Sequence, residues 1–197
     1  MRTSKFLPQL KRLFAKPVFT AEEARAQAIP ARMLSHFCHQ GMIERMGRGV
    51  YRTVSAETNL DFSIEDFVLT ALTIPKGVVC LISALCLYEL TDQLMREYWI
   101  AIPNQQKKPI RNLVRIVRMR NISLGQTKMK IGEFEISVFD RERTVVDAFR
   151  FLSDEIAIKA LQAYIRSPTQ KADLVKLSQY AKQLRVNITP YMMALTT

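Results

Sequence analysis

The chain of 197 residues has few glycines, prolines and cysteines, the residue types that mark fibrous proteins and disulfide-bonded scaffolds. Six glycines and eight prolines, set against 48% hydrophobic residues, exclude a collagen-like repeat and a disordered tail. The three cysteines form no CxxC pair, which argues against a disulfide framework and against a structural zinc site. These absences favour a globular protein in a reducing cytoplasm.

Long hydrophobic runs and catalytic signatures are also missing. The most apolar segment, 77–90, is too short to cross a bilayer, and the basic, amphipathic residues 1–14 do not have the pattern of a secretory signal. There is no glycine-rich phosphate loop, no HExxH and no GxSxG sequence. We therefore expect a cytoplasmic protein with no membrane partner, no cofactor, no bound metal and no catalytic residues.

What the chain does have is an excess of positive charge, with a net charge of +11 and a sequence pI near 9.8. Residues 1–53 hold ten Lys and Arg against three acids, and residues 104–132 hold eight with no acid. Between these segments, residues 54–63 show neither helical nor strand periodicity and are typical of a linker. We expect two domains, 1–55 and 62–197, and a polyanionic partner.

The first domain has the pattern of a winged helix-turn-helix. Apolar residues at three- and four-residue spacing predict a helix ending near Phe14, and Thr20 with Glu23 forms a capping box that begins a second helix. A third helix, 31–40, ends before Gly41, the expected left-handed terminator. Residues 42–46 and 50–52 predict a hairpin around a basic turn, 47–49, which would form the wing.

The helical wheel divides the third helix into two faces. Met33, Leu34, Phe37 and Cys38 form an apolar face, so the opposite polar face is free to read DNA. Arg48, at the tip of the hairpin, is the expected phosphate contact. The complete set of expected DNA-binding residues is Arg32, Ser35, His36, His39, Arg45, Arg48, Arg52, Lys5 and Arg12.

The second domain is expected to be a mixed α/β structure with a small sheet, which makes the whole chain α+β. Segments 62–74, 84–90, 143–152, 155–165 and 171–184 predict helices, and 78–82, 98–102, 113–119 and 134–139 predict strands. Asp140 can cap the helix that follows it. Arg143 and Asp147, one turn apart, are expected to form an exposed ion pair on that helix.

A second basic patch lies within residues 107–130 of this domain. It can contact further DNA phosphates or an acidic protein, and a solvated outer face of a half-buried sheet would have the same pattern. The candidate residues are Lys107, Lys108, Arg111, Arg115, Arg118 and Arg120.

Several segments taken together resemble the AbiEi-type antitoxins, which are transcriptional regulators of type IV toxin-antitoxin systems. The resemblance is carried by residues 19–24, 41–45, 47–51, 83–93 and 142–147. It implies an amino-terminal winged helix that represses its own operon, and a carboxy-terminal domain tied to antitoxin activity. The implied partners are double-stranded operator DNA with inverted repeats and a nucleotidyltransferase-like toxin, bound directly or countered functionally.

Two other functions remain open from the sequence. The first is a metal-dependent nuclease whose second domain supplies a basic groove and the carboxylates of Asp92, Glu97, Glu135 or Asp140, although no nuclease motif is present. The second is a transcriptional regulator whose second domain is a protein-interaction module, with no toxin partner. Metal-dependent cleavage by the purified protein would separate the nuclease from the regulators.

Overall fold

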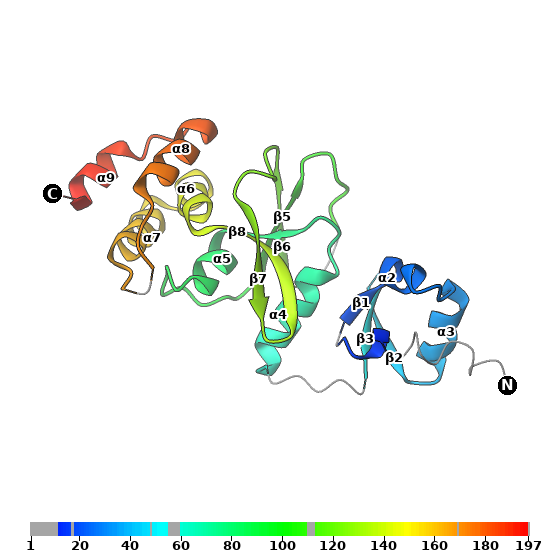
Figure 1. Cartoon of the computed structure of the whole chain (residues 1–197). Helices are drawn as coiled ribbons and strands as arrows, with labels where there is room; N and C mark the ends of the chain where they lie inside the picture. The colour runs from blue at the N-terminus through cyan, green and yellow to red at the C-terminus, as the bar shows by residue number, and fades with distance from the viewer. Residues whose placement is uncertain are drawn as a thin grey trace. The chain divides into compact units, whose positions relative to one another are not determined.

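The computed structural model describes residues 12–16, 18–47, 49–54, 60–109, 113–168 and 170–196. Helices and strands are combined with a three-stranded and a five-stranded sheet, which confirms the α+β class (Figure 1). The chain divides into two compact units, 1–75 with 130–136, and 76–129 with 137–197. The domain limits expected from composition, 1–55 and 62–197, stay a prediction, and by contacts the segments 62–75 and 130–136 group with the first unit.

In its described residues, the first unit contains a three-stranded antiparallel sheet, the helices α2, α3 and α4, and a further helical segment at 12–14. The sheet has the order β1-β3-β2. The elements are β1 (Val18–Thr20), α2 (Ala21–Ala26), α3 (Ala31–His39), β2 (Ile43–Gly47), β3 (Val50–Thr53) and α4 (Phe62–Leu72). Residues 12–14 are helical, whereas the rest of the expected first helix lies outside the described residues. Strand β1 was not predicted from the sequence.

Local signals in the sequence set the ends of α2 and α3. The capping box is confirmed: the Glu23 amide donates to the Thr20 hydroxyl at 3.1 Å, and the Thr20 amide donates to the Glu23 carboxylate at 2.7 Å. Gly41, with φ of +68°, ends α3 in the left-handed conformation that the sequence predicts. The helices and hairpin therefore lie within a few residues of their expected positions.

The second unit holds most of the five-stranded sheet, in the order β6-β5-β4-β8-β7, and within its described residues five helices; the end of β7 and the start of β8 group with the first unit. Its strands are β4 (Val78–Val79), β5 (Tyr98–Pro103), β6 (Val114–Met119), β7 (Gln126–Ile131) and β8 (Phe134–Phe139). Its helices are α5 (Leu81–Leu87), α6 (Arg141–Phe151), α7 (Asp154–Arg166), α8 (Leu174–Leu184) and α9 (Thr189–Thr196). Strand β7 and helix α9 were not predicted.

One expected strand is shorter than predicted. The segment 78–82 was expected to be a buried strand, but β4 ends at Val79, and Leu81 and Ile82 belong to α5. The buried side chain of Leu81 is combined with a φ of +48°, so the backbone turns sharply there from strand to helix. An apolar run of this length does not distinguish a strand from a buried helix, and that ambiguity caused the error.

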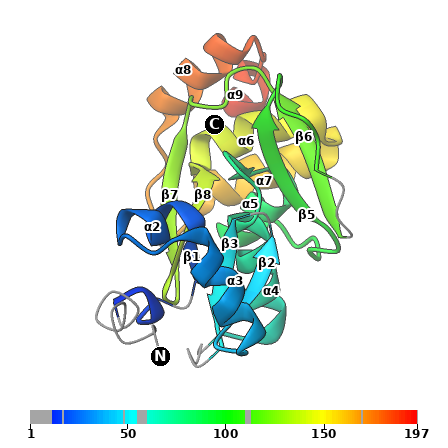
Figure 2. The ribbon, with the colours of Figure 1, turned by 90° about the vertical axis from the view of Figure 1, so that its right-hand side faces the viewer.

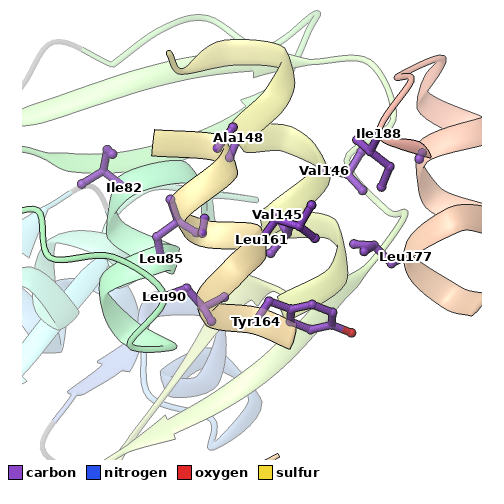
Figure 3. Packing of buried hydrophobic residues seen from close by; sticks show 13 residues of the cluster. Ile82, Leu85, Leu90, Val145, Val146, Ala148, Leu161, Tyr164, Leu177 and Ile188 are labelled. Atoms are coloured by element: carbon purple, nitrogen blue, oxygen red, sulfur yellow. The ribbon is translucent and has the colours of Figure 1, made fainter. Parts of the chain in front are cut away.

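The largest core cluster of the second unit lies around α6. Figure 3 shows Val145, Val146 and Ala148 of α6 among apolar side chains from α5, α7 and α8. Leu177 and Ala181 of α8 are buried in this cluster, while Leu174 and Leu184 pack against it, so the apolar side of α8 faces the core. Helix α6 is therefore the element on which the other helices of this unit pack.

The ion pair between Arg143 and Asp147 is buried, and its expected place on an exposed helix surface was wrong. Both side chains have an exposed fraction of 0%, and Arg143 Nε donates to an oxygen of Asp147 at 2.8 Å. The guanidinium also donates to the carbonyls of Asn121 at 2.9 Å and Leu124 at 2.8 Å. It lies 4.5 Å over the ring of Phe139. The pair thus joins α6 to the connection between β6 and β7.

Replacement of Asp147 by alanine should destabilise the protein strongly. The guanidinium of Arg143 would stay buried without its carboxylate, a loss that typically costs about 3–5 kcal/mol in the free energy of unfolding. Arg150, which also pairs with Asp147 at 2.6 Å but has a side chain 29% exposed, provides the control. Arg150→Ala should cost less than about 1 kcal/mol. Urea denaturation measures both variants, and equal losses would contradict the special role of Arg143.

Candidate nucleic-acid interface

Helix α3 presents the two faces that its sequence predicts. Leu34 and Phe37 are buried, and Met33 and Cys38 are partly buried. The opposite face is exposed and carries Arg32, Ser35, His36 and His39. The helix contains no acidic residue, so nothing on α3 itself offsets the charge of Arg32. The structure therefore brings these four expected side chains together on one solvent-facing surface.

Aromatic packing fixes the orientation of α3. The ring of Phe37 meets the edge of Phe14 at a centroid distance of 6.0 Å, and Phe14 also contacts Phe19 of β1 at 6.3 Å. After the helix, the Met42 amide donates to the carbonyl of Phe37 at 3.0 Å, which leads the chain directly into β2. The exposed face of α3 is thus held by a rigid core rather than by loops.

The hairpin places Arg45 on the same side of the sheet as the helices. Arg45 lies opposite Tyr51, and Tyr51 lies opposite Phe19, so the three side chains share one face. The ring of Tyr51 stacks on that of Phe19 at a centroid distance of 5.7 Å, so Tyr51 packs against the core of the first unit. Arg45 is exposed, and its Nε donates to the carbonyl of Gly47 at 3.3 Å. Arg48 lies outside the described residues.

Arg52 is placed differently from the other expected contacts. Because it follows Tyr51 in β3, its side chain points to the opposite face of the sheet. One guanidinium nitrogen lies 2.6 Å from a carboxylate oxygen of Glu65 in α4, whose side chain is only 11% exposed. Glu65 was not predicted. It lies one turn before the apolar Val68 and Leu69, which indicates that it faces the core, but the sequence does not identify Arg52 as its partner.

The remaining expected contacts of the first unit are Arg12 and Lys5. Arg12 is exposed in the helical residues 12–14, next to the buried Leu13, while Lys5 lies outside the described residues. Close by, Lys16 pairs with Glu23 at 2.7 Å. Burial raises the pKa of Glu23, but Lys16 and the amide and hydroxyl of Thr20 outweigh it and leave that pKa below its ordinary value. Lys16 is therefore paired internally.

The second basic patch is divided by the topology of the sheet. Strand β6 forms one edge of the sheet and β7 the other (Figure 2). The exposed Lys107, Lys108, Arg115, Arg118 and Arg120 lie on or just before and after β6. Lys128 and Lys130 lie on β7, and Arg111 lies outside the described residues. Arg115 forms an ion pair within the protein, because its guanidinium lies 3.6 Å from the carboxylate of Glu97 and 4.2 Å from the centroid of the Trp99 ring.

The four acids considered for a nuclease occupy separate structural positions. Asp140 caps α6, as expected, by accepting from the Arg143 amide at 2.8 Å. Glu97 pairs with Arg115, Glu135 is exposed on β8, and Asp92 is exposed between α5 and β5. Among the residues that the structure describes, there is no group of three or more His, Cys, Asp or Glu side chains suited to a metal ion.

A polar network surrounds the first turn of α6. Lys176 of α8 lies 2.9 Å from Glu142 and 3.0 Å from Asp140, and the hydroxyl of Tyr164 donates to Glu142 at 2.7 Å. Burial raises the pKa of Glu142, but the hydrogen bonds from Tyr164 and Lys176 outweigh it and hold that pKa below its ordinary value. Burial, with Asp140 and Glu142 nearby, raises the pKa of Tyr88 to about 12. The network therefore links α6 to α7 and α8 through groups that satisfy one another.

Arg52 and Arg45 should differ when each is replaced by glutamine. Arg52→Gln would leave the nearly buried carboxylate of Glu65 without its cation, so we expect a loss of about 1–3 kcal/mol in the free energy of unfolding. Arg45→Gln changes an exposed side chain and should stay within about 0.5 kcal/mol of the unaltered protein. Urea denaturation monitored by circular dichroism measures the free energy of unfolding of both variants. If Arg52→Gln loses no more of this free energy than Arg45→Gln, Arg52 does not stabilise the protein through Glu65.

Part of the chain matches the model of a known protein family. The model of the AbiEi antitoxin family, described as a transcriptional regulator, matches residues 8–54, the segment that contains α2, α3 and the hairpin. The resemblance to AbiEi-type antitoxins is confirmed over this part of the chain. No curated protein matches the sequence. None of the helices in the described ranges is long and apolar enough to cross a membrane.

Proposed function

Since residues 8–54 match the model of the AbiEi antitoxin family, described as a transcriptional regulator, we propose that the protein is a sequence-specific, DNA-binding repressor. The observation that carries the proposal is the exposed, acid-free face of α3 with Arg32, Ser35, His36 and His39. This face consists of donors and acceptors that can reach base edges, and it lies on a helix whose other side is fixed by the core.

The arrangement of the first unit supports docking as a winged helix. An α-helix with its side chains is about 10–12 Å across, which allows α3 to enter a major groove about 12 Å wide. Helix α2 and the turn before α3 correspond to the first part of a helix-turn-helix, and β2 with β3 forms the wing. In this mode, the hairpin follows the DNA backbone while α3 reads the groove.

The side chains take different roles in this complex. Arg32 can donate to O6 and N7 of a guanine, while Ser35, His36 and His39 reach base edges or phosphates. Arg45, with Arg48 at the hairpin tip and Arg12 and Lys5 before α2, contacts phosphates and fixes the register. Arg52 is paired with Glu65, so its contribution is to hold α4 rather than to bind DNA.

The antitoxin role extends this proposal from the family. On this view the protein acts in the cytoplasm, binds inverted repeats in its own operator as a negative autoregulator, and counters a nucleotidyltransferase-like toxin. A neighbouring gene that encodes a protein of nucleotidyltransferase character would support this role. A neighbour of another kind would favour a regulator whose second unit binds a different protein.

Replacement of Arg32 should reduce sequence discrimination, whereas replacement of Arg45 should weaken binding in general. For a duplex selected from a random pool and a shuffled duplex of equal length, Arg32→Ala should lower the ratio of the two affinities by about 5- to 150-fold, equivalent to 1–3 kcal/mol. Arg45→Ala should weaken binding to both duplexes by the same factor, because phosphate contacts are independent of sequence.

Fluorescence anisotropy at fixed salt measures these affinities. Lys182→Ala, which removes an exposed cation from α8 of the second unit, provides the control and should leave the ratio unchanged. Equal ratios for Arg32→Ala and the unaltered protein would refute base reading by α3. Absence of binding by the unaltered protein at low ionic strength would refute the whole proposal.

A further inference from the structure

Four cations gather at one end of the β5–β6 edge of the second unit. Arg118 is exposed near the end of β6, and Arg120 is exposed two residues later, in the bend that follows the strand. Lys107 and Lys108 are exposed in the segment after β5. That segment starts beside the end of β6, because the Asn104 amide donates to the carbonyl of Met119 at 3.1 Å. We name these four residues the edge patch.

The edge patch differs from a scattering of paired surface charges. No acid occurs in the sequence from Tyr98 to Gly132. In the described part of the chain, Arg118 and Arg120 have no ion-pair partner, in contrast to Arg115, Arg52 and Lys16. Side chains that hydrogen-bond to anions without adding charge adjoin the patch, since Asn104, Gln105 and Asn121 are exposed there.

The backbone beneath the patch is fixed from inside the protein. Immediately after Arg120, the carbonyls of Asn121 and Leu124 accept hydrogen bonds from the buried guanidinium of Arg143. The carbonyl of Gly125 accepts from the Asp140 amide at 2.7 Å, and a Cβ at Gly125 would lie 2.6 Å from the Cβ of Arg143. The end of β6 therefore leads into a tightly held connection, which presents Arg118 and Arg120 with little freedom of the main chain.

We propose that the edge patch is a second DNA-binding surface that contacts the phosphates of duplex DNA without reading its sequence. A row of uncompensated cations releases the counterions of a polyanion on binding, which is the main source of sequence-independent affinity. An acidic protein is the less suitable occupant, because protein interfaces are centred on apolar and aromatic side chains. None of the large exposed hydrophobic side chains in the described residues lies among the four cations of the patch.

Because the two units belong to one chain, the edge patch contributes more to DNA affinity than it would as a separate protein. Once one unit is on the duplex, the other binds at a high effective concentration, so a weak phosphate contact lengthens the complex's lifetime. This step rests on the proposed function of α3, whereas binding of phosphates by the edge patch does not. The two ideas can therefore fail separately.

The test compares the salt dependence of binding by the full-length protein and by the double variant Arg118→Gln/Arg120→Gln. The probe is a 40-base-pair duplex of random sequence, about 40 pairs being long enough for both units, and affinity is measured at several KCl concentrations. The slope of log affinity against log salt changes by ~0.9 per phosphate contact, so loss of two contacts should make it shallower by ~1.8. The control Arg166→Gln/Lys182→Gln removes two exposed cations from α7 and α8 and should leave the slope unchanged.

The possible results are distinct. If the edge-patch variant has the same slope as the unaltered protein, the inference is overturned. If that variant also no longer binds an acidic protein that the unaltered protein binds, the patch is a site for that protein instead. An equal decrease in the α7–α8 control also overturns it, because net charge alone would then explain the effect. If Arg32→Ala leaves sequence discrimination intact while the edge-patch variant has a shallower slope, the proposed role of α3 fails and the edge patch stands.

Discussion

The buried ion pair of Arg143 and Asp147 is the interaction on which the second unit depends. A guanidinium that is removed from water must find acceptors for its five N–H groups, and here they come from Asp147, two backbone carbonyls and the sulfur of Met119 at 3.6 Å. These acceptors belong to α6, to the end of β6 and to the connection that follows it. One side chain thus orders segments that are 19 to 24 residues apart in the sequence.

The sequence predicts that this pair forms, but it does not predict that the pair is buried. The spacing of four residues correctly predicts that Arg143 and Asp147 meet, but an exposed pair and a buried pair have the same spacing. Burial comes from Phe139, whose ring lies under the guanidinium, and from the chain around Asn121. The contact with Phe139 is four residues away, but the contact with Asn121 is 22 residues away and no local pattern contains it. The capping box and Gly41 were predictable because their causes lie within four residues of each other.

The missed strands have the same explanation. Strand β1 has only three residues and exists because β3 offers a pairing edge, with Phe19 opposite Tyr51. In β7, lysines alternate with Thr127, Met129 and Ile131, and this segment was interpreted only as part of a basic patch. In the candidate interface, the exposed face of α3 followed from helical periodicity. The pairing of Arg52 with Glu65 did not, because the two residues belong to elements whose packing the sequence does not specify.

Net charge alone is a poor guide to which cations bind DNA. In the first unit, Lys16 and Arg52 are held by Glu23 and Glu65, so part of the positive excess serves the fold. In the five-stranded sheet, exposed cations lie on or beside β6 and on β7, which are its two edges. Charged side chains on edge strands prevent pairing with other sheets, and that requirement applies equally to both edges. Protection of an edge therefore accounts for cations on β7 as well as on β6, whereas phosphate binding requires cations that are gathered and unpaired. Arg118 and Arg120, which meet both conditions, are the residues at which the two explanations predict different salt dependence.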